Sequence, residues 1–374
     1  MGECKILDTI LIFQGGGSLG AYECGAYRAL APWLRANGHR LVVAAGTSIG
    51  AINAAIIATQ WEDSDQGAAA LEHFWTSVAT NSLSFLSPFG VFADWNAVWT
   101  SLLLGNPRLF RPAVPLWTFS PPVTWAPFTS FYDAAPMEQT LRSFFPVFGP
   151  NRVTPRLIVT AVDLDHIRPV SFDSWDMAIT PRHILASCSL PPSFAATKID
   201  GHHFWDGGLW SNTPLREALN CLQKRNSPHP PAMSECLVFI IDLFAPQPNG
   251  SVEIAGNWDI WALRDRVLFQ DKGEYDERSA TWVNRHIEFV RELRRRVRLL
   301  AGKEQREIGD LAAFVERAAA LVEEEGRLQL RIHRIVRSDL HTDEVSREID
   351  FSPARISALI NQGHADTANV IAKM

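Results

Sequence analysis

No stretch of this 374-residue chain approaches the length of a membrane-spanning helix, although 47% of its residues are hydrophobic. Crossing a bilayer as a helix takes about 20 consecutive apolar residues. The N-terminal residues also lack the apolar core of a secretory signal peptide. We therefore expect a cytoplasmic protein without a transmembrane segment, and leave peripheral contact with a membrane surface open.

Paired cysteine and metal-binding motifs are also missing. The five cysteines are scattered, odd in number and nowhere arranged as Cys-x-x-Cys. This usage argues against a disulfide framework and indicates reduced, mostly buried thiols. The sequence has no His-Glu-x-x-His motif and no acidic loop with calcium-binding spacing. We expect neither a metal nor another cofactor.

An excess of positive charge is absent as well. Lysine and arginine number 35 against 41 aspartates and glutamates, which gives a net charge of −6. A nucleic-acid partner would need a basic domain or stripe, so we do not expect one. The length is sufficient for one large α/β domain and a smaller appendage.

The apolar runs present in the chain predict the strands of such a domain. They are buried-strand runs at residues 7–13, 41–45, 156–162 and 236–242. Helix-forming residues follow the first two runs, at about 19–37 and 51–58. Strands that read as continuous apolar runs and alternate with helices indicate a mostly parallel sheet covered on both faces.

Beyond a proline- and glycine-containing boundary at 246–250, the chain changes character. Residues 275–325 read as charged amphipathic helices, and residues 328–337 alternate polar and apolar, which is typical of a half-exposed strand. Basic side chains in this region either face a lipid surface or form a solvated helix face paired with glutamates, and we favour the second interpretation. The residues concerned are Arg291, Arg294, Arg295, Arg296 and Arg298, with Glu288, Glu292 and Glu304 nearby.

Residues 74–135 are dense in aromatic residues and proline. They contain five Trp, eight Phe and seven Pro, and they show no period-two alternation, so neither long helices nor a sheet are expected. The segment is either a packed aromatic subdomain or a lid that lines an apolar cleft. Its members include Trp95, Trp99, Trp117, Trp125, Phe119, Phe128 and Phe131.

A serine stands at a sharp turn between the second apolar run and the helix-forming stretch after it. Gly46 and Gly50 flank Ser48, two residues away on either side. Glycines at these places remove side chains that would clash in so tight a turn. A serine that only caps a helix would not need both of them. The pattern favours Ser48 as a nucleophile, with an ordinary helix cap as the alternative.

A second glycine cluster follows the first apolar run and contains Gly15, Gly16, Gly17 and Gly20. It formally matches the Gly-x-Gly-x-x-Gly pattern of dinucleotide sites. Such a site needs an acidic residue about 20 positions later, and none occurs between residues 24 and 61. We favour an anion hole, in which backbone N–H groups bind the oxyanion of a tetrahedral intermediate.

Ser48 needs a base to take its proton, and a histidine is the obvious candidate. His229 stands among prolines with no element to position it, and His202 and His203 read as ordinary hairpin residues. A Ser–His–Asp triad therefore stays an alternative only. Asp163 and Asp165, which follow a predicted strand, read as solvated loop residues.

The favoured base is Asp206, which comes directly before Gly207 and Gly208. These glycines let the chain turn tightly and bring the carboxylate close to another backbone. Taken alone, Asp-Gly-Gly is most often only a turn. It indicates a catalytic aspartate only in combination with the glycine loop and the Ser48 turn.

In this order, the glycine loop 15–20, the elbow 46–50 and the turn 206–208 resemble the patatin-like phospholipases. Segments 186–192 and 210–214 are also similar to blocks of that family, and the resemblance extends over about residues 7–245. One departure is Leu19, where many members carry Arg or Lys, and this leaves the charge preference for the substrate in doubt.

The resemblance implies an α/β protein with a three-layer α/β/α fold and a mostly parallel central sheet. It places a catalytic domain at 1–248, with the aromatic insertion at about 74–135. Residues 249–374 resemble the mainly helical C-terminal extension of some bacterial members.

The same resemblance implies a lipid acyl hydrolase, of phospholipase A or esterase type, with a Ser–Asp dyad. Ser48 would attack an ester carbonyl, Asp206 would accept its proton, and an acyl-enzyme would form without a metal. The amides of Gly15, Gly16 and Gly17 would bind the oxyanion. Supporting turn positions are Gly20, Gly46, Gly50, Gly207 and Gly208. A transacylase using the same acyl-enzyme, and a non-catalytic lipid-binding protein of the same fold, are the alternatives.

Overall fold

A computed structural model provides the structure of the chain. It describes residues 8–62, 64–80, 101, 104–113, 130–150, 155–223, 235–244, 269, 273–300, 313–318, 329–338 and 349–374. Of the aromatic side chains named above for residues 74–135, Phe131 is described and the other six lie outside these ranges. His229 and the predicted domain boundary at residue 248 also lie outside them.

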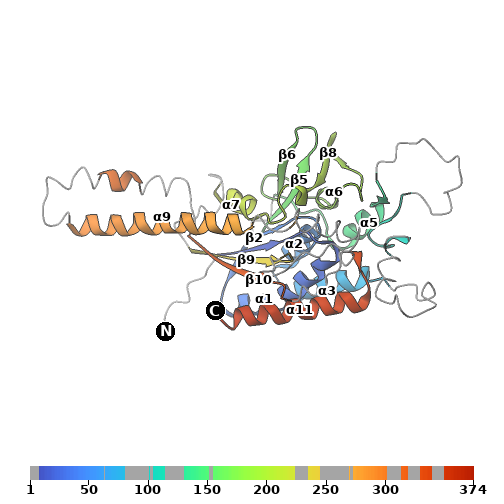
Figure 1. The fold of residues 1–374 in the computed structure, drawn as a ribbon, viewed down its shortest axis with the longest axis horizontal. Coiled ribbons are helices and arrows are strands. Elements are labelled where there is room, and N and C mark those ends of the chain that lie inside the picture. Colours follow the sequence, from blue (N-terminus) through green and yellow to red (C-terminus); the bar gives the residue numbers. More distant parts are fainter. Residues whose placement is uncertain are drawn as a thin grey trace, which may run out of the picture.

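An eight-stranded sheet forms the centre of the molecule, in the order β10-β9-β1-β2-β5-β8-β7, with β6 paired to β5 (Figure 1). Its first five strands are parallel. They are β1 (Asp8–Phe13), β2 (Arg40–Gly46), β5 (Arg156–Asp163), β9 (Glu235–Asp242) and β10 (Gln329–Val336). The strands predicted from apolar runs are therefore present, and they are almost fully buried because helices cover them.

The other strands run antiparallel to their neighbours. They are β6 (Arg168–Asp173), β7 (Thr197–Ile199) and β8 (His202–Asp206). A separate two-stranded sheet joins β3 (Arg111–Pro112) to β4 (Tyr132–Asp133). This pair corrects the expectation of no strand within residues 74–135, because two residues per strand are too few to produce a readable alternation.

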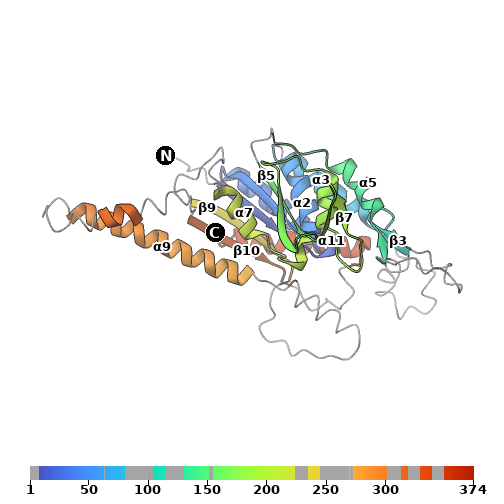
Figure 2. The ribbon, with the colours of Figure 1, turned by 90° about the horizontal axis from the view of Figure 1, so that it is seen from above.

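Helices pack on both faces of the sheet, as the three-layer prediction requires (Figure 2). A large apolar core joins one face to α1 (Gly20–Ala36), α2 (Ile49–Gln60), α3 (Ser64–Val78), α5 (Ala135–Phe144), α6 (Pro181–Ser187) and α11 (Pro353–Ile371). A smaller core on the opposite face contains Leu215, Ala218 and Cys221 of α7 (Leu215–Gln223). The side chains of β1 alternate between the two cores, with Leu11 and Phe13 on one side and Ile10 and Ile12 on the other.

Two elements of the C-terminal part are built into this architecture. Strand β10 extends the sheet by pairing along the whole of β9, and α11 lies along α1 (Figure 1). The Tyr22 hydroxyl of α1 donates a hydrogen bond to Asp366 of α11 at 3.0 Å. The long helix α9 (Gly273–Leu300) projects from the body next to β10. Within the described ranges, no helix has the length and apolar character needed to cross a membrane.

Candidate active site

Ser48 occupies the sharp turn between β2 and α2, as its flanking glycines predicted. Its backbone has φ 54° and ψ −126°, in a region that residues other than glycine rarely adopt. A Cβ on Gly46 would lie 2.2 Å from the Gly50 carbonyl oxygen, and one on Gly50 would lie 2.6 Å from the carbonyl oxygens of Phe13 and Gln14. The Ser48 hydroxyl makes no capping hydrogen bond to α2. The hydroxyl is therefore held by a strained turn and is available for another contact.

The register of the sheet explains how Asp206 reaches this turn from far along the chain. Gly46, the last residue of β2, lies opposite Val159 of β5, so Ser48 stands level with a point two residues further along β5. On the other side of β5, the antiparallel strand β8 ends with Asp206 opposite Ala161. Strand β5 lies between β2 and β8, so Ser48 after β2 and Asp206 at the end of β8 come together at the end of β5.

Hydrogen bonds fix the segments that carry Ser48 and Asp206. The Thr47 and Thr160 hydroxyl oxygens are 2.7 Å apart in a buried hydrogen bond. Gly207 and Gly208 form a short 3₁₀ turn after β8, and the Gly208 N–H donates to Asp206 Oδ1 at 2.7 Å. The Ser48 backbone N–H donates to the Ser187 hydroxyl at the end of α6 at 2.9 Å.

The Ser48 side chain lies close enough to the Asp206 carboxylate to lower its pKa. Asp206 is only 2% exposed. Burial raises the pKa of this carboxyl to about 7, against the opposing effect of Ser48 and of the hydrogen bond from the Gly208 N–H. A carboxylate whose pKa lies near neutrality is suited to accept a proton and to return it.

The glycine loop passes directly beside the elbow, and Asn212 holds it there. Asn212 Oδ1 accepts from the Gly15 N–H at 2.9 Å, and Asn212 Nδ2 donates to the Gly15 carbonyl oxygen at 3.0 Å. The Gly15 N–H, predicted to bind the oxyanion, is therefore already occupied by a protein acceptor. Within the described residues, the N–H groups of Gly16 and Gly17 have no such acceptor. Gly20 is the first residue of α1.

A buried polar network fixes the residue before this loop. The Gln14 backbone N–H donates to Glu23 Oε1 at 2.7 Å, and Asn53 donates to Glu23 Oε2 at 2.7 Å. The Gln14 side chain bonds to the Thr213 hydroxyl at 2.8 Å and to the Leu243 N–H at 2.9 Å. Burial raises the pKa of Glu23 well above its usual value. The network ties β1, α1, α2 and the segment after Asp206 to one point.

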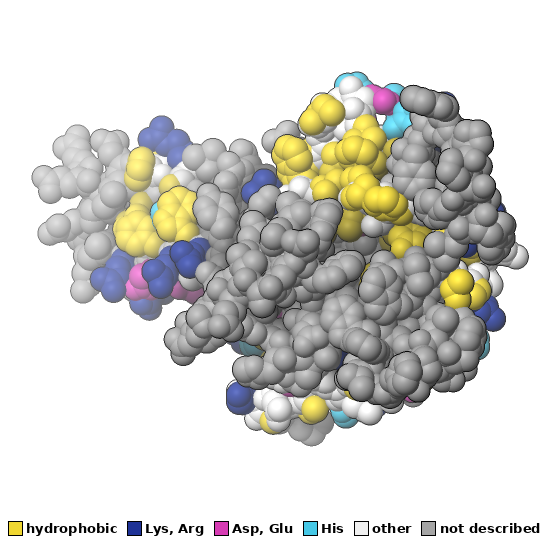
Figure 3. All heavy atoms as spheres, turned by 45° about the vertical axis from the view of Figure 1, so that its right-hand side comes forward, with side chains coloured by type: hydrophobic (Ala, Val, Ile, Leu, Met, Phe, Trp, Pro, Cys, Tyr) yellow, Lys and Arg dark blue, Asp and Glu magenta, His cyan; other side chains and the backbone are white. Residues whose placement is uncertain are grey.

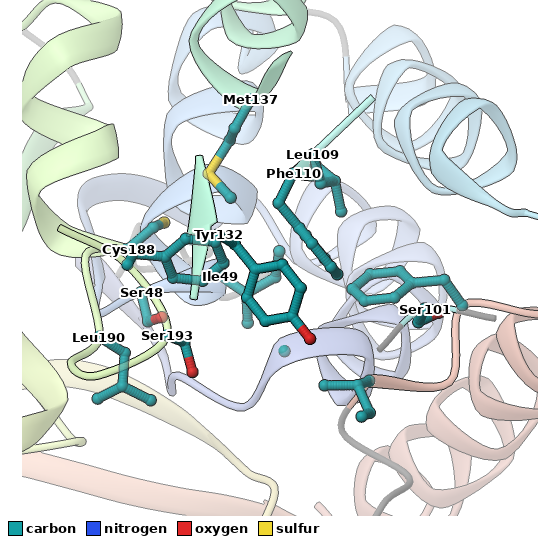
Figure 4. A pocket seen from close by; sticks show the side chains of 14 residues that line it. Ser48, Ile49, Ser101, Leu109, Phe110, Tyr132, Met137, Cys188, Leu190 and Ser193 are labelled. Carbon is teal, nitrogen blue, oxygen red and sulfur yellow. The ribbon is translucent and has the colours of Figure 1, made fainter. Parts of the chain in front are cut away.

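A pocket with a cavity volume of about 150 Å³ opens beside Ser48 (Figure 4). Ser48 and Cys188 lie together on one side of it, and Leu109 and Phe110 lie on the other. The described lining contains no charged residue; its members are Gly17, Ser48, Ile49, Ser101, Leu109, Phe110, Tyr132, Met137, Cys188, Leu190, Ser193, Phe194, Ile349 and Phe351. Four of these belong to residues 74–135, the segment for which an apolar cleft was one of the two hypotheses.

Cys188 is a further neighbour of Ser48 in the pocket. Burial, and to a lesser degree the charge of nearby Asp206, raise the pKa of the thiol well above its usual value. The thiol therefore stays protonated at neutral pH, and it does not compete with Ser48 as a nucleophile.

His202 and His203, the described histidines considered as alternative bases, contact Asp165. His202 Nδ1 lies 2.8 Å from Asp165 Oδ2, and His203 Nδ1 lies 3.6 Å from Asp165 Oδ1. Asp163 is buried at the end of β5 and pairs with His166, which corrects its prediction as a solvated loop residue. Potential ligand atoms of Asp163, Asp165 and His202 all lie within 4.8 Å of one another. The hydrogen bonds within this surface cluster account for its arrangement, and we assign no metal to it.

Comparison with known proteins bears directly on this geometry. The model of the patatin-like phospholipase family matches residues 11–219. This chain belongs to that family. The match includes the glycine loop, the Ser48 elbow and the Asp206 turn, and it confirms the resemblance and the α/β fold class expected from the sequence. Membership of the patatin-like phospholipases supports a lipid acyl hydrolase activity in general terms.

A crystal structure of VipD from Legionella pneumophila is a distant structural neighbour of this patatin-like chain. The two are 11% identical with a TM-score of 0.36, over 98% of this chain and 67% of that one. No curated protein sequence matches the chain.

Sequence reasoning missed the residues that hold the site together. Glu23 and Asn53 lie on helices and carry no spacing signal that distinguishes them from other buried polar residues. Ser187 lies in segment 186–192, which is similar to a patatin-like block, but its contact with Ser48 could not be read from the sequence. Asn212 had a signal, because it lies in a segment similar to a patatin-like block directly after the Asp206 turn, but its contact with Gly15 could not be read from the sequence.

Proposed function

We propose that this patatin-like protein is a serine hydrolase of lipid acyl esters, with Ser48 as nucleophile and Asp206 as general base. The observation that carries the proposal is the placement of Ser48, on its strained turn, beside the buried Asp206 carboxylate at the end of β8. The apolar pocket beside Ser48 supports an acyl chain as the group that the enzyme binds.

In the proposed reaction, Ser48 Oγ attacks the ester carbonyl carbon and its proton passes to the Asp206 carboxylate. The carbonyl oxygen becomes an oxyanion, which the N–H groups of Gly16 and Gly17 bind. The intermediate then expels the alcohol, which takes the proton from Asp206, and leaves an acyl group on Ser48. Water attacks the acyl-enzyme, gives a proton to Asp206, and releases the fatty acid as Ser48 recovers its proton.

The proposed oxyanion hole has two N–H donors, those of Gly16 and Gly17, instead of the three expected from the sequence. Gly15 anchors the glycine loop, because its N–H donates a hydrogen bond to Asn212 Oδ1 and is not free to bind the oxyanion. Two remaining donors are a common number for such a hole, and removing one donor typically costs about 3 kcal/mol of transition-state stabilisation. The α1 helix, which begins just after the loop, adds the positive end of its dipole near the same place.

The test is hydrolysis of soluble short-chain p-nitrophenyl esters by the purified full chain. Ser48→Ala and Asp206→Asn should each lower kcat/KM at least about a thousandfold. His202→Ala, at the other end of β8, is the matched control and should retain the wild-type rate. A fluorophosphonate probe should label the wild-type protein and not Ser48→Ala. Wild-type activity in Asp206→Asn, or loss of activity in the His202 variant, would contradict the dyad.

A further inference from the structure

One side of helix α9 is fixed to the edge of the sheet. Asn284 Nδ2 donates to the Leu330 carbonyl oxygen at 2.6 Å, and Asn284 Oδ1 accepts from the Leu330 N–H at 2.9 Å. Arg291 Nη1 donates to Gln329 Oε1 at 2.5 Å. Ile287, between them on the helix, is 1% exposed. The orientation of α9 about its own axis is therefore set by these contacts with β10.

The opposite side of α9 carries two large aromatic side chains in solvent. Trp282 is 60% exposed and Phe289 is 66% exposed. At 3.6 residues per turn, positions 282, 286 and 289 fall on one face, away from Asn284 and Ile287. The His286 ring lies against the Trp282 ring, with centroids 3.8 Å apart. We call Trp282, His286 and Phe289 the outer stripe.

The part of α9 that carries the outer stripe is rich in arginine. Residues 278–298 contain seven arginines and two glutamates, an excess of five positive charges in a chain whose net charge is −6. The rest of the chain thus carries an excess of eleven negative charges. Arg285 and Arg296 lie on the same side of the helix as the stripe, and both are exposed. Arg296 pairs with Glu292 at 2.7 Å, as expected from the sequence for arginines of this helix. Within the described part of the chain, Arg285 has no ionic partner.

Figure 3 shows this combination on one face of the molecule. Hydrophobic side chains gather on the projecting α9 arm, and lysine or arginine side chains lie on both sides of them. Within α9 the basic excess lies in residues 278–298, because Glu274, Asp276 and Glu277 precede them on the same helix.

We propose that the outer stripe of α9 binds the surface of an anionic lipid membrane. Trp and Phe enter the boundary between headgroups and acyl chains, and the arginines beside them bind anionic headgroups. A flat, negatively charged surface suits a projecting convex helix, whereas a protein partner would have to supply a groove around it. The inference deepens the proposed function, because it brings the hydrolase to the surface that holds its substrate, but binding itself needs no catalysis.

The experiment measures co-sedimentation of the full chain with lipid vesicles. Ser48→Ala serves as the parent, so that no lipid is consumed. The vesicles contain phosphatidylcholine alone or an equal mixture of phosphatidylcholine and phosphatidylglycerol. The parent should bind the mixed vesicles much more tightly than the neutral ones, and added salt should weaken the binding.

Substitutions in the outer stripe should remove this binding without unfolding the chain, because both aromatics are mostly in solvent. Trp282→Ser and Phe289→Ser should each weaken binding about tenfold. Arg285→Gln should weaken binding to mixed vesicles about fivefold and leave neutral vesicles unaffected. Val147→Ser, at a position 63% exposed after α5, is the matched control and should bind as the parent does. Circular dichroism melting verifies that each variant is folded.

Each outcome decides the proposal. Parent-like vesicle binding by the Trp282 and Phe289 variants overturns it, and so does binding that ignores phosphatidylglycerol. A parent that stays free of vesicles but self-associates through the stripe in sedimentation velocity also overturns it, in favour of contact between copies. Soluble-ester hydrolysis by the wild-type chain separates the two proposals: its presence without vesicle binding rejects only the membrane surface, and its absence with stripe-dependent binding rejects only the proposed function.

Discussion

The Asn212 side chain binds both backbone groups of Gly15, although 197 positions separate the two residues. A side-chain amide accepts through its oxygen and donates through its nitrogen, so it can bind the N–H and the C=O of a single residue at once. This contact fixes the direction of the glycine loop and therefore where the next N–H groups point. Asn212 follows the Asp206 turn, so one short segment supplies the proposed base and the anchor of the proposed oxyanion hole.

The first prediction concerns this anchor. Asn212→Ala should lower kcat for a soluble ester by about ten- to a hundredfold and change KM little, because a misdirected loop weakens transition-state stabilisation more than binding. Ser211→Ala, which removes only a 3.2 Å bond to the Thr213 carbonyl oxygen, is the control. An effect on KM alone would show that Asn212 serves substrate binding instead.

The second prediction is the pH dependence of activity. Asp206 accepts a proton only when it is ionised, and burial raises its pKa to about 7. The value of kcat/KM should therefore rise with pH through about 7 and level off above it. A stopped-flow or plate assay with an ester that does not ionise measures the profile. A rise of kcat/KM centred near pH 4 would contradict this prediction, because it would mean that Asp206 titrates as an exposed carboxylate does.

The third prediction concerns stability. The pKa of Asp206 is about 7 in the folded chain and 3.8 in the unfolded one, so its protonated form favours folding. That contribution is complete below about pH 3.8 and is lost as pH rises through about 7. Asp206→Asn avoids the buried charge, and it should raise the free energy of unfolding by a few kcal/mol at pH 8, because one pKa unit corresponds to about 1.4 kcal/mol.

The gain in Asp206→Asn should shrink at pH 5, where the native carboxyl is already protonated. Thermal unfolding of the two proteins at both pH values measures it. The asparagine can keep the hydrogen bond to the turn, with its oxygen accepting from the Gly208 N–H. A stability gain that is equal at pH 5 and pH 8 would contradict an origin in the ionisation of Asp206.

The fourth prediction tests the pocket as an acyl site. Each methylene buried contributes about 0.8 kcal/mol, so kcat/KM should rise about fourfold per added methylene until the pocket is full. Met137 is 6% exposed and lines the pocket, so Met137→Trp should shift the optimum to shorter acyl chains. Val147→Trp, outside the pocket, should leave the profile unchanged. A flat profile in the wild-type protein would argue against an acyl chain in this pocket.

Much of the parallel sheet was predictable, because buried strands read as apolar runs and helices follow them. The runs at 7–13, 41–45, 156–162 and 236–242 correspond to β1, β2, β5 and β9, and the alternating residues 328–337 correspond to β10. The partners of β10 were not predictable, since an alternating strand does not indicate which strand it pairs with. Its place beside β9, together with the packing of α11 on α1, joins the C-terminal part to the main sheet. The division at residue 248 stays a prediction.

The sequence alone determined the sharp turn at Ser48. Only glycine at positions 46 and 50 lets the backbone of the turn pass as close to its neighbours as the structure shows. The sequence also determined that a glycine loop would follow β1. Only the tertiary structure decided which glycine amides face the pocket, because Asn212 takes the N–H of Gly15. The meeting of Ser48 with Asp206 was likewise decided by tertiary structure: it depends on β8 running antiparallel beside β5, and pairing between distant strands leaves no trace in the spacing of residues along the chain.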